Sequence, residues 1–127
     1  MNKKLGIAGS FFGLTAVVIG AFGAHGLEDS IDASSLVSFE TGVKYQMYHA
    51  LLLLLLSLFA ISERTKRMLL ILFICGIVLF SGSIYALTTN VLSAFDFSKI
   101  AFLTPLGGLL LIVGWVLLLI HFIKYHR

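Results

Sequence analysis

The amino-acid sequence predicts an all-α membrane protein with four transmembrane helices in an antiparallel bundle. The 127 residues are 59% hydrophobic and only 12% charged, with a mean hydropathy of +1.05, whereas soluble domains carry about 25% charged residues. Four long apolar segments follow one another, and none alternates with the period of two that a membrane β-barrel strand needs. Residues 1–127 are expected to form a single domain, because no room is left for a second one.

Each apolar segment has about the 20 residues that a transmembrane helix needs, and a helix satisfies every backbone polar group within its own segment. Thr104 and Pro105 predict an N-cap and first residue for the fourth helix, and Thr65 is the predicted N-cap of the third. Gly23 and Gly26 are expected to end the first helix in the left-handed conformation. The expected helices cover about residues 5–24, 34–61, 68–89 and 105–123.

The distribution of basic residues predicts that both termini are cytoplasmic. In a chain with four spans, one side of the membrane receives Lys3, Lys4, Arg64, Lys66, Arg67, Lys124 and Arg127. The other side receives residues 26–39 and 90–103, where Lys99 is the single basic residue. By the positive-inside rule the basic side faces the cytoplasm, and we expect a bacterial-type plasma (inner) membrane protein. The net charge of +3 does not indicate nucleic-acid binding, because these basic residues mark membrane edges.

The N-terminal segment also permits a second interpretation, a cleaved signal peptide, because two lysines precede an apolar stretch and small residues. The apolar stretch is longer than the 7–15 residues typical of a signal. Its length favours a retained helix.

Glycine spacing predicts close contacts between helices. Gly9 and Gly13 are four residues apart and Gly13 and Gly20 are seven apart, so all three share one helix face. Gly107 and Gly108 provide a similar small surface on the fourth helix. We expect these glycines to pack helices within one chain, although the same residues would also suit the contact of a homo-oligomer.

The second helix contains a polar stretch, residues 40–49. The apolar run after it, Ala50–Ile61, is about 18 Å long as a helix, against a hydrocarbon core of about 30 Å. A spanning helix must therefore draw part of the polar stretch into the membrane. Ionisable groups at that depth are expensive and indicate a functional site.

The polar stretch forms two stripes on a helix, and Tyr45 and His49 form the second of them. Glu40, Lys44 and Tyr48 lie four residues apart, and a Glu before a Lys at this spacing can form an ion pair. His49 is the deepest of these residues, and we expect it to face the bundle with a partner on the third helix. The candidate polar site comprises His25, Glu40, Lys44, Tyr45, Gln46, Tyr48, His49, Ser81, Ser83 and Tyr85. The alternative is an interfacial anchor, in which Lys44 snorkels and the tyrosines form a belt.

The sequence lacks the usual signatures of catalysis. Cys75 is the single cysteine, so neither a disulfide nor a cysteine metal cluster is available within the chain. The four histidines share no ligand spacing, and Ser81 has no general base near it in sequence. We therefore expect no catalytic residue, no metal, no cofactor and no enzymatic activity.

Four motifs in the chain resemble one known family. They are residues 20–27 (GAFGAHGL), 42–51 (GVKYQMYHAL), 79–87 (LFSGSIYAL) and 104–108 (TPLGG), with Gly114 and Trp115 after the last. In this order they resemble the small membrane family catalogued as domain of unknown function 423, whose eukaryotic relatives are named transmembrane protein 256. The resemblance covers essentially the whole chain and implies a four-helix membrane protein of this length. It implies neither a reaction nor a set of catalytic residues.

Three functional classes fit these observations. The first is an accessory or scaffold protein that packs in the lipid bilayer with itself or with a larger membrane complex. The second is a small oligomeric transporter or proton-linked channel that uses Glu40, Lys44 and His49. The third is a lipid binder or lipid-directed enzyme with its groove in the outer leaflet. We rank them in this order.

Overall fold

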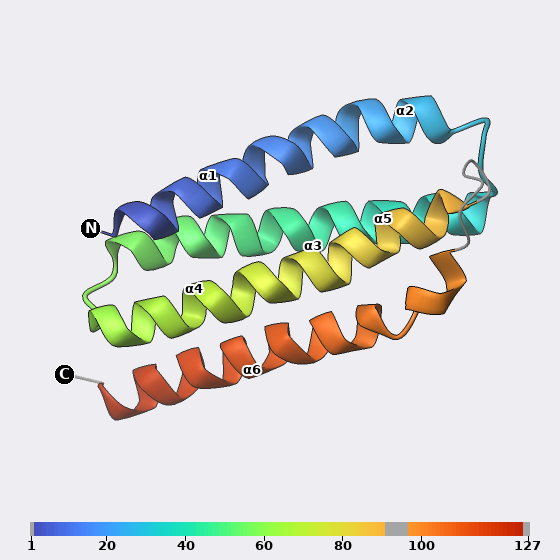
Figure 1. The fold of residues 1–127 in the computed structure, drawn as a ribbon. Coiled ribbons are helices and arrows are strands. Elements are labelled where there is room, and N and C mark those ends of the chain that lie inside the picture. The colour runs from blue at the N-terminus through green and yellow to red at the C-terminus, as the bar shows by residue number, and fades with distance from the viewer. Residues whose placement is uncertain (1, 91–96, 126–127) are drawn as a thin grey trace.

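The structure is a computed structural model that describes residues 2–90 and 97–125, and it contains four long antiparallel helical runs (Figure 1). The regular structure of these residues is entirely helical, which confirms the all-α prediction. The first run comprises α1 (Lys3–Val18), the π-helical η1 (Ile19–Gly23) and α2 (Ala24–Leu27), and the second is α3 (Ala33–Leu58). The third comprises α4 (Glu63–Ile77), the π-helical η2 (Val78–Gly82) and α5 (Ser83–Thr88), and α6 (Leu103–Lys124) follows the 3₁₀ turn η4 (Phe97–Ile100).

Three of the described helical runs are long and apolar enough to cross a membrane: Lys3–Leu27, Glu63–Thr88 and Leu103–Lys124. The 26-residue α3 is long enough but is not among them. The polar stretch 40–49 lies in the middle of α3 and lowers its apolar content. The number of spans and the orientation of the termini therefore stay predictions.

The predicted N-caps of the third and fourth helices are wrong. Ser62, rather than Thr65, caps α4, and its Oγ accepts a hydrogen bond from the Thr65 backbone N–H at 3.2 Å. The helix thus begins five residues before the expected Met68 and includes the basic residues that sequence analysis placed in a loop. The N-cap of α6 is Phe102 rather than Thr104.

The first helix does not end at a left-handed glycine, as predicted. Among the described residues no glycine has a positive φ. The chain instead passes Gly23 within a π turn and continues helically to Leu27. Glycine is used here for close packing, since a Cβ on Gly23 would lie 2.8 Å from the Phe39 ring.

The helices contact one another mainly in sequence order. The helix α1 packs along α3, which packs against α4, η2 and α5, and α6 packs against α4 and η2. As a result, α1 and α6 lie at opposite edges (Figure 1). The helix α1 begins, and α6 ends, at the same end of the molecule, which we call the termini end (Figure 1).

The contact between α1 and α3 depends on glycine. A Cβ on Gly9 would lie 2.8 Å from the Leu54 Cγ and 2.9 Å from the Ala50 carbonyl oxygen. Gly20 would meet Val43 at 3.0 Å, whereas Gly13 would meet its neighbour at an ordinary 3.8 Å. These glycines therefore face another helix of the same chain.

The contact between α6 and the third helical run is tighter still. A Cβ on Gly107 would lie 2.3 Å from the Phe80 backbone nitrogen, whereas one on Gly108 would meet the Phe80 ring at 3.6 Å. A Cβ on Gly114 would lie 2.6 Å from the buried Phe73 ring. This close approach brings the next residue, Trp115, beside the polar stretch of α3.

Candidate functional site

The polar stretch of α3 divides into a buried face and an exposed face. Gly42, Gln46 and His49 are buried, and the same 4–3 spacing continues into the buried Leu53 and Leu56. This spacing is typical of a helix face that packs against other helices. The polar stretch is therefore built into the core on this side.

His49 is held by partners on both ring nitrogens. Its side chain is 4% exposed, its Nδ1 lies 2.6 Å from the Tyr45 carbonyl oxygen, and its Nε2 lies 3.0 Å from the Trp115 Nε1. A carbonyl oxygen only accepts and an indole N–H only donates. The two contacts therefore select the neutral tautomer of His49, with the proton on Nδ1.

The partner of His49 differs from the prediction. The sequence pointed to Ser81, Ser83 or Tyr85 on the third helix, but Trp115 comes from α6. The signal in the sequence was the pair Gly114-Trp115, because a glycine lets α6 approach closely and an indole N–H seeks an acceptor.

Gln46 connects three helical runs. Its Nε2 donates to the Phe12 carbonyl oxygen at 2.9 Å and to the Thr15 Oγ1 at 2.7 Å, both on α1. Its Oε1 accepts a hydrogen bond from the Tyr85 hydroxyl of α5 at 2.7 Å. Phe12 and Thr15 were missed by sequence analysis, although a threonine within an apolar helix is a visible signal.

The two predicted serines bind backbone or hydroxyl groups nearby. The buried Ser81 donates from Oγ to the Gly42 carbonyl oxygen at 2.7 Å, which joins η2 to α3. The Ser83 hydroxyl donates to the Phe80 carbonyl oxygen at 3.0 Å, and it also pairs with the Thr104 hydroxyl of α6. Thr104 thus connects two helices rather than capping its own.

The remaining predicted site residues lie on the surface. Glu40, Lys44 and Tyr48 form an exposed stripe, and among the described residues Glu40 and Lys44 form no ion pair. Tyr45 is 42% exposed and packs its ring against Phe80, with 5.0 Å between the ring centroids. His25 is exposed, on α2. The structure therefore links Gln46 to Tyr85 and Ser81 to the Gly42 carbonyl oxygen, and these hydrogen bonds form a polar network around α3 that leaves the charged residues outside it.

The charged residues of α3 border a small cavity. It has a volume of about 200 Å³, lies between η1 and α3, and is lined by Gly20, Phe39, Glu40, Val43 and Lys44. Within the described part of the chain, no three His, Cys, Asp or Glu residues lie together in a way that could hold a metal ion.

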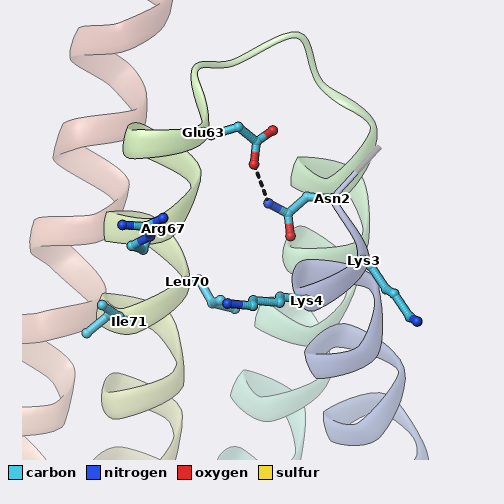
Figure 2. Close-up of a pocket in the computed structure, with 7 residues that line it drawn as sticks. All are labelled: Asn2, Lys3, Lys4, Glu63, Arg67, Leu70 and Ile71. Carbon is cyan, nitrogen blue, oxygen red and sulfur yellow. Dashed lines mark hydrogen bonds between the residues drawn. The ribbon is translucent and has the colours of Figure 1, made fainter.

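A larger groove lies at the termini end, between α1 and α4 (Figure 2). Its volume is about 570 Å³, and its lining includes Lys3, Lys4, Glu63, Arg67, Leu70 and Ile71. Asn2 bridges the groove, because its Nδ2 donates to the Glu63 carboxylate at 2.9 Å (Figure 2). In the sequence these basic residues indicate only the orientation of the helices, because their meeting in one groove depends on helix packing.

Comparison with known proteins identifies the family of this chain. The family model described as protein of unknown function DUF423 matches residues 19–108, which contain the polar network of α3 and η2. The chain belongs to the DUF423 family. No solved structure matches it.

The curated relatives of this DUF423 chain are membrane proteins. It is 41% identical over 125 residues to the UPF0382 membrane protein YwdK of Bacillus subtilis, an alignment that covers 94% of this chain and 95% of the relative. It is 40% identical over 117 residues to a UPF0382 membrane protein of Haemophilus influenzae, with coverages of 91% and 89%. The UPF0382 inner membrane protein YgdD of Escherichia coli is 36% identical over 118 residues, with coverages of 91% and 86%. The DUF423 chain is therefore an integral membrane protein.

Proposed function

We propose that this chain is a non-enzymatic accessory protein of the bacterial inner membrane, which packs laterally with copies of itself or with a larger membrane complex. One observation carries the proposal: every buried polar side-chain atom among the described residues has a hydrogen-bond partner. Gln46 and His49 form hydrogen bonds with other helices of the same chain. Polar groups used in this way hold helices together, so we assign these buried residues a structural role.

The two edge helices supply faces for lateral packing. The helix α1 packs mainly on α3, and α6 packs mainly on the third helical run, so each has a long side without a neighbour from the described chain. Leu14 on α1 is 65% exposed and Leu119 on α6 is 60% exposed. Either side suits lipid or another transmembrane helix.

The proposed topology has four spans with both termini in the cytoplasm. As a helix of 26 residues, α3 is about 39 Å long, which exceeds the hydrocarbon core of about 30 Å. The Asn2–Glu63 hydrogen bond supports this topology, because it joins the start of α1 to the start of α4. If α1 crosses the membrane and α4 begins on the side where α1 began, the chain must cross back along α3. The name of the Escherichia coli relative supports the inner membrane.

The geometry gives less support to transport. Glu40 and Lys44 face outward from α3, whereas His49 faces inward, so the three residues do not line one path. A proton relay through His49 would also have to displace Trp115. The cavity beside Glu40 and Lys44 gives the outer-leaflet lipid binder one specific observation in its favour.

Site-specific photo-cross-linking in native membranes tests the accessory role. A photoreactive amino acid replaces Leu14 or Leu119 at the edges, and replaces Leu55, a 51% exposed residue of α3, as a control. We expect protein adducts from the edge positions and mainly lipid adducts from Leu55. The mass of each adduct separates a second copy from a different protein. Lipid adducts alone at both edges would refute lateral packing.

A further inference from the structure

We infer that the groove between α1 and α4 at the termini end binds the headgroup of an anionic phospholipid. The groove has a volume of about 570 Å³, which is large enough for a phosphate headgroup and the first part of an acyl chain. It opens where α1 and α4 both begin, so it lies at the level expected for the lipid headgroups.

The groove carries uncompensated positive charge. Lys3, Lys4 and Arg67 line it together with a single carboxylate, Glu63. That carboxylate accepts a hydrogen bond from Asn2, and among the described residues it forms no ion pair with the three cations. The groove therefore has more cationic than acidic side chains, and an anion would balance the excess positive charge.

Two of the cations approach the groove from different helices. Lys4 extends from α1 toward α4, whereas Lys3 points away from α4 (Figure 2). Arg67 comes from the second turn of α4. A lysine and an arginine on either side of a groove can bind one phosphate together, with the planar guanidinium taking two of its oxygens.

The wall below the cations is apolar, which favours a lipid over a soluble phosphate. Leu70 and Ile71 follow Arg67 by three and four residues, so they lie one helical turn further along the same face of α4. Ile71 is 56% exposed. A cationic rim above an apolar wall matches a phosphate with an acyl chain attached, and basic pockets between transmembrane helices bind acidic headgroups in this way.

Lipid titration of the purified full chain tests the inference. The protein is stripped of lipid in detergent and titrated with phosphatidylglycerol, phosphatidylcholine or soluble glycerol phosphate, and bound molecules are counted by native mass spectrometry. We expect phosphatidylglycerol to bind roughly tenfold more tightly than phosphatidylcholine, and the double variant Lys4→Ala/Arg67→Ala to lose roughly that preference. The conservative double variant Lys4→Arg/Arg67→Lys should retain it.

A control variant and a pair of single variants complete the test. Arg64→Ala removes an exposed basic residue from the first turn of α4 that does not line the groove, and it should leave the preference unchanged. If the double alanine variant does not fold, the single variants Lys4→Gln and Arg67→Gln should each lose about threefold. Three results would overturn the inference. The first is equal binding of the two lipids, and the second is an unchanged preference in the folded alanine or glutamine variants. The third is competition by glycerol phosphate as strong as by phosphatidylglycerol. Because the inference does not depend on lateral packing, its failure would leave the cross-linking result unaffected.

Discussion

At the scale of single residues, His49 is held in one hydrogen-bonding state by Tyr45 and Trp115. The Tyr45 carbonyl requires a proton on Nδ1, and the Trp115 indole requires a bare Nε2. A second proton on the ring would point at the indole N–H and would force the two side chains apart. The histidine therefore joins α3 to α6 in its neutral form.

The substitution Trp115→Phe tests this contact. It keeps an aromatic ring beside His49 but removes the indole N–H that donates to Nε2, so we expect the free energy of unfolding to fall by about 1 kcal/mol. Denaturation in detergent measures the loss. Tyr48→Phe is the matched control, because Tyr48 is 56% exposed and should tolerate the change. Equal stability of the Trp115→Phe variant and the unmodified protein would contradict the role of the indole N–H.

At the scale of helical elements, one glycine sets how closely α6 approaches η2. Gly107 faces the backbone of Phe80, which cannot rotate away as a side chain can. The neighbouring Gly108 faces only the Phe80 ring at ordinary contact distance. Two adjacent glycines that look equivalent in sequence therefore differ in structural importance.

The pair Gly107→Ala and Gly108→Ala measures this difference. The first should separate α6 from η2 and lower the free energy of unfolding by about 1–3 kcal/mol. The second should leave stability unchanged or raise it by up to about 1 kcal/mol, because alanine favours the helix. Thermal unfolding of both variants in the same detergent gives the comparison. Similar losses in both would argue against the backbone contact.

A buried lysine joins two other elements. Lys66 is 3% exposed, and its Nζ lies 3.4 Å from the Ser57 carbonyl oxygen near the end of α3. The last carbonyls of a helix carry partial negative charge, so a cation stabilises them. The Asn2 backbone N–H donates to the same carbonyl oxygen at 2.9 Å.

Replacing Lys66 by methionine preserves the side-chain stem and removes the charge. We expect the free energy of unfolding to fall by about 1 kcal/mol. Arg64→Met removes one positive charge from the same turn at an exposed position and should have little effect. Chemical denaturation of the two variants compares them, and equal effects would show that only the overall charge matters.

Helical segments and their polar content could be predicted from the sequence, whereas the direction of each polar side chain could not. The order of apolar segments indicated four long helices, and the family motifs agreed. The rotation of α3 about its own axis could not be predicted, because it depends on which neighbouring helix packs closely against each glycine. The spacing of Gly42, Gln46, His49, Leu53 and Leu56 contained part of that answer. The contact with Trp115 required the packing of α6 as well.

At the scale of the whole molecule, the role of α3 determines the topology. If α3 crosses the membrane, both termini lie on one side, and if it does not, they lie on opposite sides. The structure describes three helices that meet the length and composition of a span, with α3 beside them. The side of the C-terminus therefore separates three spans from four.

Reporter fusions measure that side. Green fluorescent protein attached after Arg127 should fluoresce in bacteria, and alkaline phosphatase at the same position should be inactive. Alkaline phosphatase fused after Glu28, behind the first helical run alone, should be active and serves as the control. An active phosphatase at Arg127 would place the C-terminus outside and would contradict the four-span topology.

The Gln46 contacts have a consequence for how the chain enters the bilayer during synthesis. As α3 emerges from the ribosome, α1 is already available, and it offers the Phe12 carbonyl and the Thr15 hydroxyl to the Gln46 amide. Tyr85 becomes available only after another helical run has been made. We expect the translocon to release α1 and α3 together as a hairpin, because α1 supplies hydrogen-bond partners to the less apolar α3.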